Sequence, residues 1–212
     1  MHNFVNTIDT FGDNAVIDSI IDRTITEFND NALVTIGSYA FYKCIELTTI
    51  DLPNVTSIAY SAFYGCTALR SINIPAVTSI DAYNTFSECK SLTEVVLPAC
   101  TNVGHGAFSY CNAIKVIDCA TTNKLSIGNN AFSYCLLDAL ILRSDSVASL
   151  SSVNAFSDTR VAKGAGYIYA PASLLSDYKS ATNWSTYSTQ FRALEDYTID
   201  GTTTGALDET KI

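Results

Sequence analysis

One stretch of sequence, Ile58 to Pro75, recurs along most of the chain with its apolar residues at the same relative positions. Each copy carries a phenylalanine, and successive phenylalanines lie 22 to 24 residues apart. They are Phe41, Phe63, Phe86, Phe108, Phe132 and Phe156. A unit this short cannot bury its apolar side alone, so it must stack against its neighbours in the chain. The period therefore predicts a solenoid of about six coils.

The spacing within each unit predicts its course. Ile50 and Leu52 alternate with polar residues, which is typical of a short strand with one buried face. The pattern Ala62-Phe63-x-x-Cys66-x-x-Leu69 has three-residue spacing, which favours a short helical or 3-10 turn. The residue after the leading aliphatic is often glycine, which predicts a left-handed corner there. These glycines are Gly37, Gly104 and Gly128.

Both ends of the chain depart from the repeat. Residues 1–23 are predicted to be an N-terminal segment with a capping helix, because the apolar residues between Asp13 and Asp22 form one helical stripe. Residues 24–170 carry the repeats. Residues 171–195 are rich in aromatic residues and begin with proline, which predicts a C-terminal helical cap, with a second helical segment from Trp184 to Leu194. Residues 196–212 are expected to form a polar tail.

The motif I-G-x-x-A-F-x-x-C-x-x-L-x-x-I-x-L-P, at Ile36 to Pro53, resembles the BspA-like leucine-rich repeats. The resemblance covers residues 24 to about 170 and recurs in five good copies. It implies a leucine-rich repeat solenoid of right-handed α/β type, with short parallel strands and short helical or 3-10 turns. With the predicted ends, the expected fold class is such a solenoid with helical caps at both ends.

Two classes of function follow from resemblance. BspA-like repeats occur in bacterial and protist surface proteins, where adhesion to host or matrix proteins is the usual role. This implies a non-catalytic protein-binding or cell-surface adhesion module at the cell surface or outside the cell. The stretch from Ile168 to Tyr187 is also similar to the closing segment of repeat proteins from gut bacteria and their prophages. The alternative is therefore a structural, tail-associated protein of a phage or prophage. The first residues of the sequence do not have the pattern of a signal peptide.

Composition excludes several other classes. The formal charge is −9 and only 12 residues are lysine or arginine, so a nucleic-acid partner is not expected. The longest apolar runs are far too short for a membrane-spanning helix. With two histidines and no phosphate-binding or nucleophile motif, the sequence predicts neither an enzyme nor a cofactor. The expected partner is another protein.

The seven cysteines follow the repeat. Five lie three residues after a repeat phenylalanine: Cys44, Cys66, Cys89, Cys111 and Cys135. Residues on successive coils stack in a line about 5 Å apart, so they do not converge as a tetrahedral metal site requires. Their parallel Cβ vectors also suit a disulfide poorly. We therefore predict reduced, buried thiols with a structural role.

A candidate binding face follows from the outward positions of the predicted strands. Nine of these positions form two adjacent columns, with polar residues early in the chain and apolar residues later. They are Thr49, Asp51, Ser71, Asn73, Glu94, Val96, Val116, Asp118 and Ile141. Repeat solenoids often bind proteins through their sheet faces. An ordinary solvated sheet is the alternative interpretation, against which the outward apolar residues favour an interface.

Overall fold

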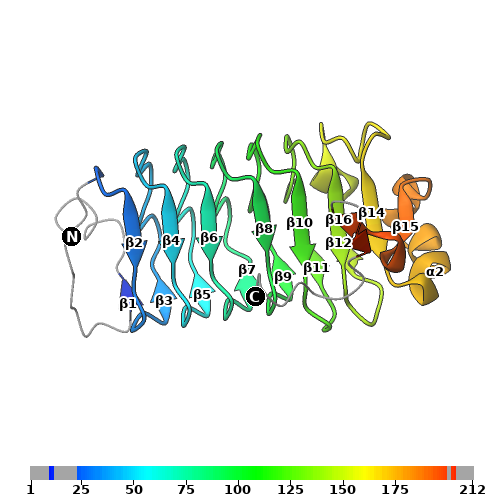
Figure 1. Ribbon diagram of the computed structural model, residues 1–212, viewed down its shortest axis with the longest axis horizontal. Coiled ribbons are helices and arrows are strands. Elements are labelled where there is room, and N and C mark those ends of the chain that lie inside the picture. Colours follow the sequence, from blue (N-terminus) through cyan, green and yellow to red (C-terminus); the bar gives the residue numbers. More distant parts are fainter. Residues whose placement is uncertain (1–9, 12–22, 200–201, 204–212) are drawn as a thin grey trace.

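The computed structural model describes residues 10–11, 23–199 and 202–203, and it shows a row of stacked coils with a compact cap at one end (Figure 1). Each coil supplies one short strand to each of two faces of the stack. All paired strands of the coils run parallel, because each coil repeats the course of the one before it. The predicted leucine-rich repeat solenoid is confirmed.

One face of the stack is a continuous sheet of seven two-residue strands. In spatial order these are β1 (Thr10–Phe11), β3 (Thr35–Ile36), β5 (Ser57–Ile58), β7 (Ser79–Ile80), β9 (Asn102–Val103), β11 (Ser126–Ile127) and β13 (Ser149–Leu150). Equivalent residues of successive coils lie opposite each other, as in the pairing of Ile80 with Val103. The repeat spacing thus sets the register directly.

The other face, here called the strand face, is divided into two sheets. The first contains β2 (Glu27–Asn29), β4 (Thr49–Asp51) and β6 (Ser71–Asn73). The second contains β8 (Glu94–Val96), β10 (Val116–Cys119), β12 (Ala139–Leu142), β14 (Tyr167–Ala170) and β15 (Phe191–Ala193). Strands β6 and β8 belong to consecutive coils but are not paired, so the strand face is interrupted at this point alone among the described coils.

The phenylalanine turns form the third side of each coil and hold the stack together. Phe63 and Phe86 stack with ring centroids 5.0 Å apart, and Phe86 and Phe108 stack at 5.3 Å. All six repeat phenylalanines are fully buried. The backbone N–H of each of the first five also donates to the next coil, as from Phe63 to Thr85 at 2.9 Å. This side is therefore both the hydrophobic core and a hydrogen-bonded ladder.

Each phenylalanine turn contains residues with a left-handed backbone, but not at the predicted glycines. Positive φ occurs two residues before the phenylalanine in five coils and two residues after it in all six. Glycine is required at Gly104 for another reason, because a Cβ atom there would lie 2.5 Å from the carbonyl oxygen of Asp81 in the preceding coil. The predicted left-handed corner is therefore wrong at Gly37, Gly104 and Gly128, none of which has a positive φ, and at Gly104 and Gly128 close contact between coils excludes a side chain.

The same turns contain the i to i+3 hydrogen bonds that the three-residue spacing predicts, as from the N–H of Cys44 to the carbonyl of Phe41. The residues with positive φ interrupt the turns, so most coils carry a series of tight turns in place of a continuous helix. A regular 3-10 turn forms in the last coil, at Val153–Phe156.

The C-terminal cap closes the last coil with side chains. It contains a 3-10 turn (Ala172–Leu174), helix α2 (Leu175–Ser180), a second 3-10 turn (Trp184–Tyr187), strand β15 and a third 3-10 turn (Leu194–Asp196). Trp184 Nε1 donates to the Ala148 carbonyl at 2.6 Å, and the Tyr178 hydroxyl accepts from the Ala148 N–H at 2.9 Å. These side chains satisfy backbone groups that a further coil would otherwise pair.

The cap is therefore only partly helical, which corrects the predicted helical cap. Phe191 and its neighbours form β15 and extend the strand face parallel to β14, because the apolar spacing there also fits a strand. None of the described helices is long and apolar enough to span a membrane. The capping helix predicted between Asp13 and Asp22 lies outside the described residues.

The segment after the cap turns back over the strand face. Tyr197 is only 7% exposed and packs against Tyr169, with ring centroids 4.7 Å apart. The next strands, β16 (Thr198–Ile199) and β17 (Thr202–Thr203), pair antiparallel as a hairpin. The segment expected to be a polar tail from residue 196 onward thus contains a buried aromatic residue at its second position.

Candidate binding face and groove

The structure brings the nine predicted face residues together in two blocks. In the first block Thr49 lies opposite Ser71, and Asp51 lies opposite Asn73. In the second, Glu94 pairs with Val116, while Asp118 lies between Val96 and Ile141. The two columns are therefore formed as expected within each block, but the break between β6 and β8 separates the blocks.

The part of the second block around β10 and β12 is covered by the chain itself. Ile141 is only 2% exposed, because it packs with Ala139 against Leu194 and Tyr197. Val116 is partly buried against the same cluster. The expectation that Ile141 is an outward residue available to a partner is therefore wrong. Its apolar side chain is matched by Leu194, from the predicted helical cap, and by Tyr197, from the predicted polar tail.

Asp118 is engaged in an ion pair within this covered region. The Arg143 guanidinium donates from Nε at 3.0 Å and from Nη2 at 2.9 Å to the Asp118 carboxylate. The two side chains are only 8% and 14% exposed. A two-point contact with this degree of burial fixes both side chains, so Asp118 has a structural partner within the chain.

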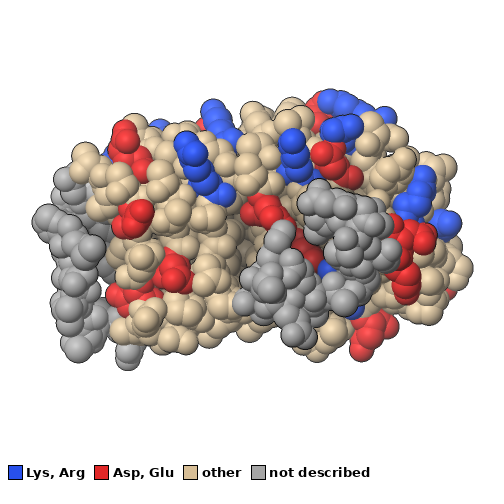
Figure 2. Space-filling view, viewed as in Figure 1, with Lys and Arg blue, Asp and Glu red and all other residues tan. Residues whose placement is uncertain are grey.

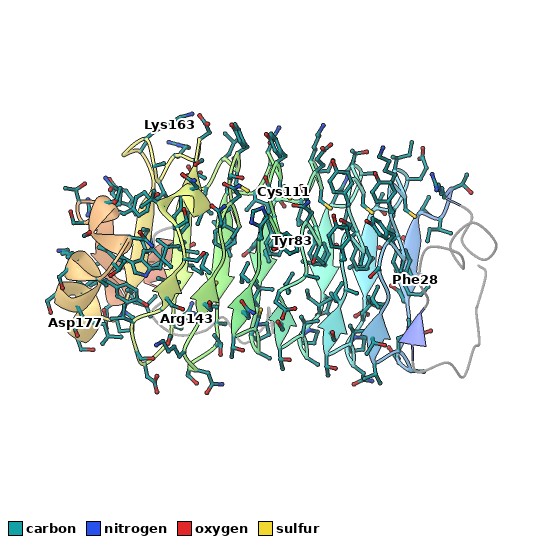
Figure 3. All side chains as sticks on the ribbon, turned by 180° about the vertical axis from the view of Figure 1, so that it is seen from behind. Phe28, Tyr83, Cys111, Arg143, Lys163 and Asp177 are labelled. Atoms are coloured by element: carbon teal, nitrogen blue, oxygen red, sulfur yellow. The ribbon has the colours of Figure 1, made fainter. Side chains whose placement is uncertain are left out.

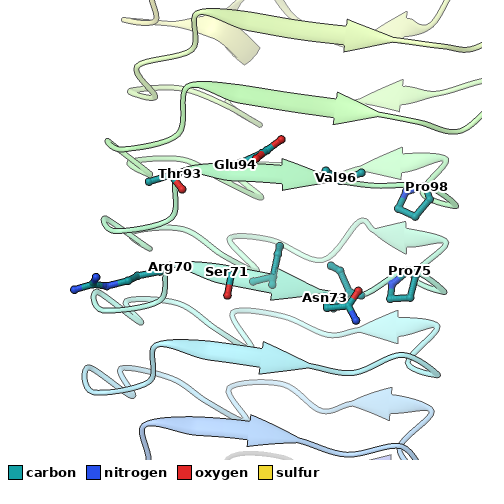
Figure 4. Close-up of a pocket in the computed structure, with 10 residues that line it drawn as sticks. Arg70, Ser71, Asn73, Pro75, Thr93, Glu94, Val96 and Pro98 are labelled. Atoms are coloured by element: carbon teal, nitrogen blue, oxygen red, sulfur yellow. The ribbon is translucent and has the colours of Figure 1, made fainter. Parts of the chain in front are cut away.

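The first block remains open and borders a groove. Strands β6 and β8 lie on either side of a hollow with a volume of about 310 Å³ (Figure 4). Its lining is Arg70, Ser71, Ile72, Asn73, Ile74, Pro75, Thr93, Glu94, Val96 and Pro98. Four of the nine predicted face residues therefore line this groove: Ser71, Asn73, Glu94 and Val96.

The groove exposes a position that is buried in the neighbouring coils. Ile50, Val95 and Ile117 occupy the central inward position of their strands and are at most 2% exposed. Ile72 occupies the same position in β6 but is only partly buried. The hollow therefore has an apolar floor at Ile72, and its walls carry both polar side chains and the apolar residues Pro75, Val96 and Pro98. The sequence did not indicate this groove, because the inward residue of β6 is as apolar as the inward residues of β4, β8 and β10.

Charge is unevenly distributed over this face. Figure 2 shows lysine and arginine side chains along one edge of the strand face, and aspartate and glutamate nearer its middle. At the groove, Arg70 is exposed at the start of β6, while Glu94 lies on the opposite wall. Asp51 accepts a hydrogen bond from Asn73 Nδ2 at 2.7 Å, which orders the polar wall formed by β4 and β6.

The five cysteines of the repeat lie inside the stack, as Cys111 does in Figure 3, and all are buried. The Cys66 Sγ donates to the carbonyl of Phe41 in the preceding coil at 3.0 Å, and Cys111 donates to Phe86 at 3.1 Å. Burial raises the pKa of the Cys44 thiol to about 12 and that of Cys100 to about 11. A structural role for these thiols remains a prediction that this geometry supports.

The thiol prediction can be tested by titration with a thiol reagent. At pH 8 the native protein should react slowly, because burial blocks access and keeps the thiols protonated. In denaturant all seven thiols should react. Fewer than seven reactive thiols in the unfolded chain would show that some are paired, and rapid labelling of the native protein would show that the stack is open.

The same pKa shifts predict how stability depends on pH. A thiol whose pKa is raised in the folded state contributes to stability, and this contribution is complete below the thiol's unfolded pKa of about 8.5. That contribution is lost as pH rises towards the folded values of about 11 for Cys100 and about 12 for Cys44. The free energy of unfolding, measured by denaturant titration at each pH, should therefore fall as the pH rises from about 8.5 towards 12.

Within the described part of the chain, no group of three or more histidine, cysteine, aspartate or glutamate side chains is arranged to hold a metal ion. His105 contacts Tyr83, with ring centroids 5.0 Å apart. The features that stand out chemically are therefore the groove and the open block of the strand face, which combine hydrogen-bonding groups with apolar residues such as Ile72 and Val96.

Stacked parallel coils, one strand per coil on the strand face and a buried phenylalanine column define a leucine-rich repeat protein. Comparison with known families identifies which kind: the chain belongs to the BspA type leucine rich repeat family, whose model matches residues 34–162 in six copies. The match covers more than half of the chain and confirms the resemblance seen in the repeat motif.

Two solved structures to which this chain is similar are those of bacterial proteins. A leucine rich cell surface protein from Faecalibacterium prausnitzii A2-165 is 28% identical over 66% of this chain and 44% of its own, with a TM-score of 0.48. The pneumococcal vaccine antigen PcpA is 14% identical over 80% of this chain and 40% of its own, with a TM-score of 0.60, a likeness of fold. The chain spans less than half the length of either protein. No curated protein matches it.

Proposed function

We propose that the chain is a non-catalytic protein-recognition module that binds a partner protein at a cell surface through the open block of its strand face. The observation that carries the proposal is the contrast between the two ends of this face. Around β10 and β12 it is covered by Leu194 and Tyr197. Around β4, β6 and β8 it is polar, open and hollowed by the groove.

Two further features support this proposal. Membership of the BspA type leucine rich repeat family makes protein binding the expected role, because stacked repeats present an extended surface to a partner. The surface protein from Faecalibacterium prausnitzii and the antigen PcpA are both bacterial proteins with this architecture. A role in cell adhesion would follow if the partner is a host or matrix protein.

A direct binding assay tests the proposal. The full chain is immobilised and exposed to two panels of purified proteins, one from host matrix and one from bacterial surfaces. Saturable binding to a matrix protein would support adhesion, whereas binding confined to bacterial surface proteins would favour a phage-borne role. Failure to bind any member of either panel would contradict the proposal.

Two matched variants show whether the strand face is the surface in use. Ser71 and Ser57 are both exposed serines in short strands, but they lie on opposite faces of neighbouring coils. Ser71→Arg should weaken binding at least tenfold, because it places a long charged side chain in the open block. Ser57→Arg should leave binding unchanged, and equal effects of the two substitutions would contradict the use of this face.

A further inference from the structure

We propose that the groove between β6 and β8 accepts an extended segment of a partner protein as an added parallel strand. The segment has an apolar residue that faces Ile72 and an acidic residue beside Arg70. This inference rests on the proposed protein-binding function and specifies its chemistry. Strand addition is a known mode of peptide recognition, in which backbone hydrogen bonds supply affinity and side-chain pockets supply specificity.

The backbone of both strands is oriented for such an addition. Alternate residues of a parallel strand direct their N–H and C=O groups to opposite sides. The Leu52 N–H donates to the Asn73 carbonyl at 2.9 Å, so the backbone N–H and C=O of Asn73 point towards β4. The backbone N–H and C=O of the adjacent Ile72 therefore point towards the groove. Likewise, the Leu97 N–H donates to the Asp118 carbonyl at 2.8 Å, so the backbone groups of Leu97 point towards β10. The backbone N–H and C=O of Val96 therefore point into the groove from the other side.

The break is confined to one side of the two coils. On the opposite face, β7 and β9 of the same coils pair at both residues. On the phenylalanine side, the rings of Phe63 and Phe86 stack at 5.0 Å and the Gly65 N–H donates to the Ser87 carbonyl at 2.8 Å. The coils are therefore held together on two sides and separated on the third, so an added strand can part β6 and β8 without dismantling the core.

The lining of the groove indicates the composition of the added strand. Ile72 leaves an inward apolar position partly uncovered, so the residue that points inward should be apolar. Ser71 and Asn73 are exposed and polar, so the residues that point outward should be polar. Arg70 is exposed at the start of β6, where a parallel strand begins, so an acidic residue at the N-terminal end of the segment complements its charge.

The probe for the test is the peptide acetyl-Glu-Thr-Val-Thr-Val-Thr-amide, labelled for fluorescence anisotropy and titrated against the full chain. Val96→Pro should weaken its binding at least tenfold, because proline removes the N–H that faces the groove and places its ring there. Val96→Thr keeps that N–H and should bind nearly as well as the unaltered chain. No saturable binding of the peptide, or equal binding by both variants, would overturn the proposal.

Two further controls test the geometry. A peptide N-methylated at both valines loses the N–H donors of one edge, and a peptide N-methylated at the inner threonines loses those of the other edge. If the peptide inserts between two strands, each of these methylated peptides should bind at least tenfold more weakly than the unmethylated peptide. Arg70→Glu should weaken binding of the peptide, and replacing the peptide's glutamate with lysine should restore it. Tight binding of either methylated peptide would refute insertion between both strands.

Hydrogen exchange shows whether the groove exists in solution before any peptide binds. The Ile72 and Val96 amides should exchange at least tenfold faster than that of Ile117 in the fully paired β10, and the peptide should slow them. Equal protection without peptide would mean that β6 and β8 are paired in solution, which would overturn the proposal. If a partner protein binds but Val96→Pro leaves that binding unchanged, the recognition function stands and strand addition fails.

Discussion

Replacing Phe86 with alanine is expected to lower the free energy of unfolding by about 3–5 kcal/mol. The ring is fully buried and lies parallel to both neighbours, with interplanar angles of 2° to Phe63 and to Phe108. Truncation would leave a cavity in the middle of the column that the surrounding backbone ladder prevents from collapsing, because Phe86 itself donates to Ala107 at 2.8 Å. Denaturant unfolding followed by circular dichroism measures the change.

An exposed aromatic residue in the same coil provides the control. Tyr83 is 55% exposed and lies outside the column, so Tyr83→Ala should change the free energy of unfolding by less than about 1 kcal/mol. If Phe86→Ala also cost less than about 1 kcal/mol, the phenylalanine column would not be the core of the stack.

Replacing Trp184 with alanine is expected to cost a further large share of stability, again about 3–5 kcal/mol. Its indole is 1% exposed and contacts Phe156, with ring centroids 5.8 Å apart, so it seals the end of the phenylalanine column. The substitution also removes the donor to the Ala148 carbonyl, which leaves that buried acceptor without its bond. Unfolding experiments should therefore show a lower midpoint for this variant.

Two comparisons separate the packing of Trp184 from its hydrogen bond. Trp184→Phe keeps an aromatic ring and loses only the N–H and part of the volume, so it should cost about 1–3 kcal/mol. Hydrogen exchange should locate the Trp184→Ala effect in β13 and β14 before it reaches β4. If the alanine variant were as stable as the unaltered chain, the last coil would not depend on the cap for its stability.

The repeat itself could be predicted from sequence because each coil meets a near copy of itself. Phe63 stacks on Phe41 and Phe86 since all three occupy one position in a unit of nearly constant length. The same reasoning placed Thr49 opposite Ser71 and Asp51 opposite Asn73, and the structure has both pairs. It also placed the repeat cysteines in one line inside the stack, where the structure has them buried.

The predictions that were wrong concern contacts that the residue types within one coil do not reveal. Ile141 was expected to face outward because its strand position does, but Leu194 and Tyr197 return from the cap to cover it. Gly104 was assigned to a left-handed corner, whereas its small size is required by the backbone of Asp81 in the coil below. In both cases the deciding contact joins residues more than twenty positions apart in the chain.

The sequence by itself determined the coil, the register of successive coils and the residues that fill the core, because a period of 22 to 24 residues gives every position the same neighbours. Only the tertiary structure decided where the strand face is covered and where it is open. The groove between β6 and β8 arises where consecutive coils separate on one side while they remain joined on the other two. Such a separation is a relation between two whole coils, and no pattern of residue types within a single repeat encodes it.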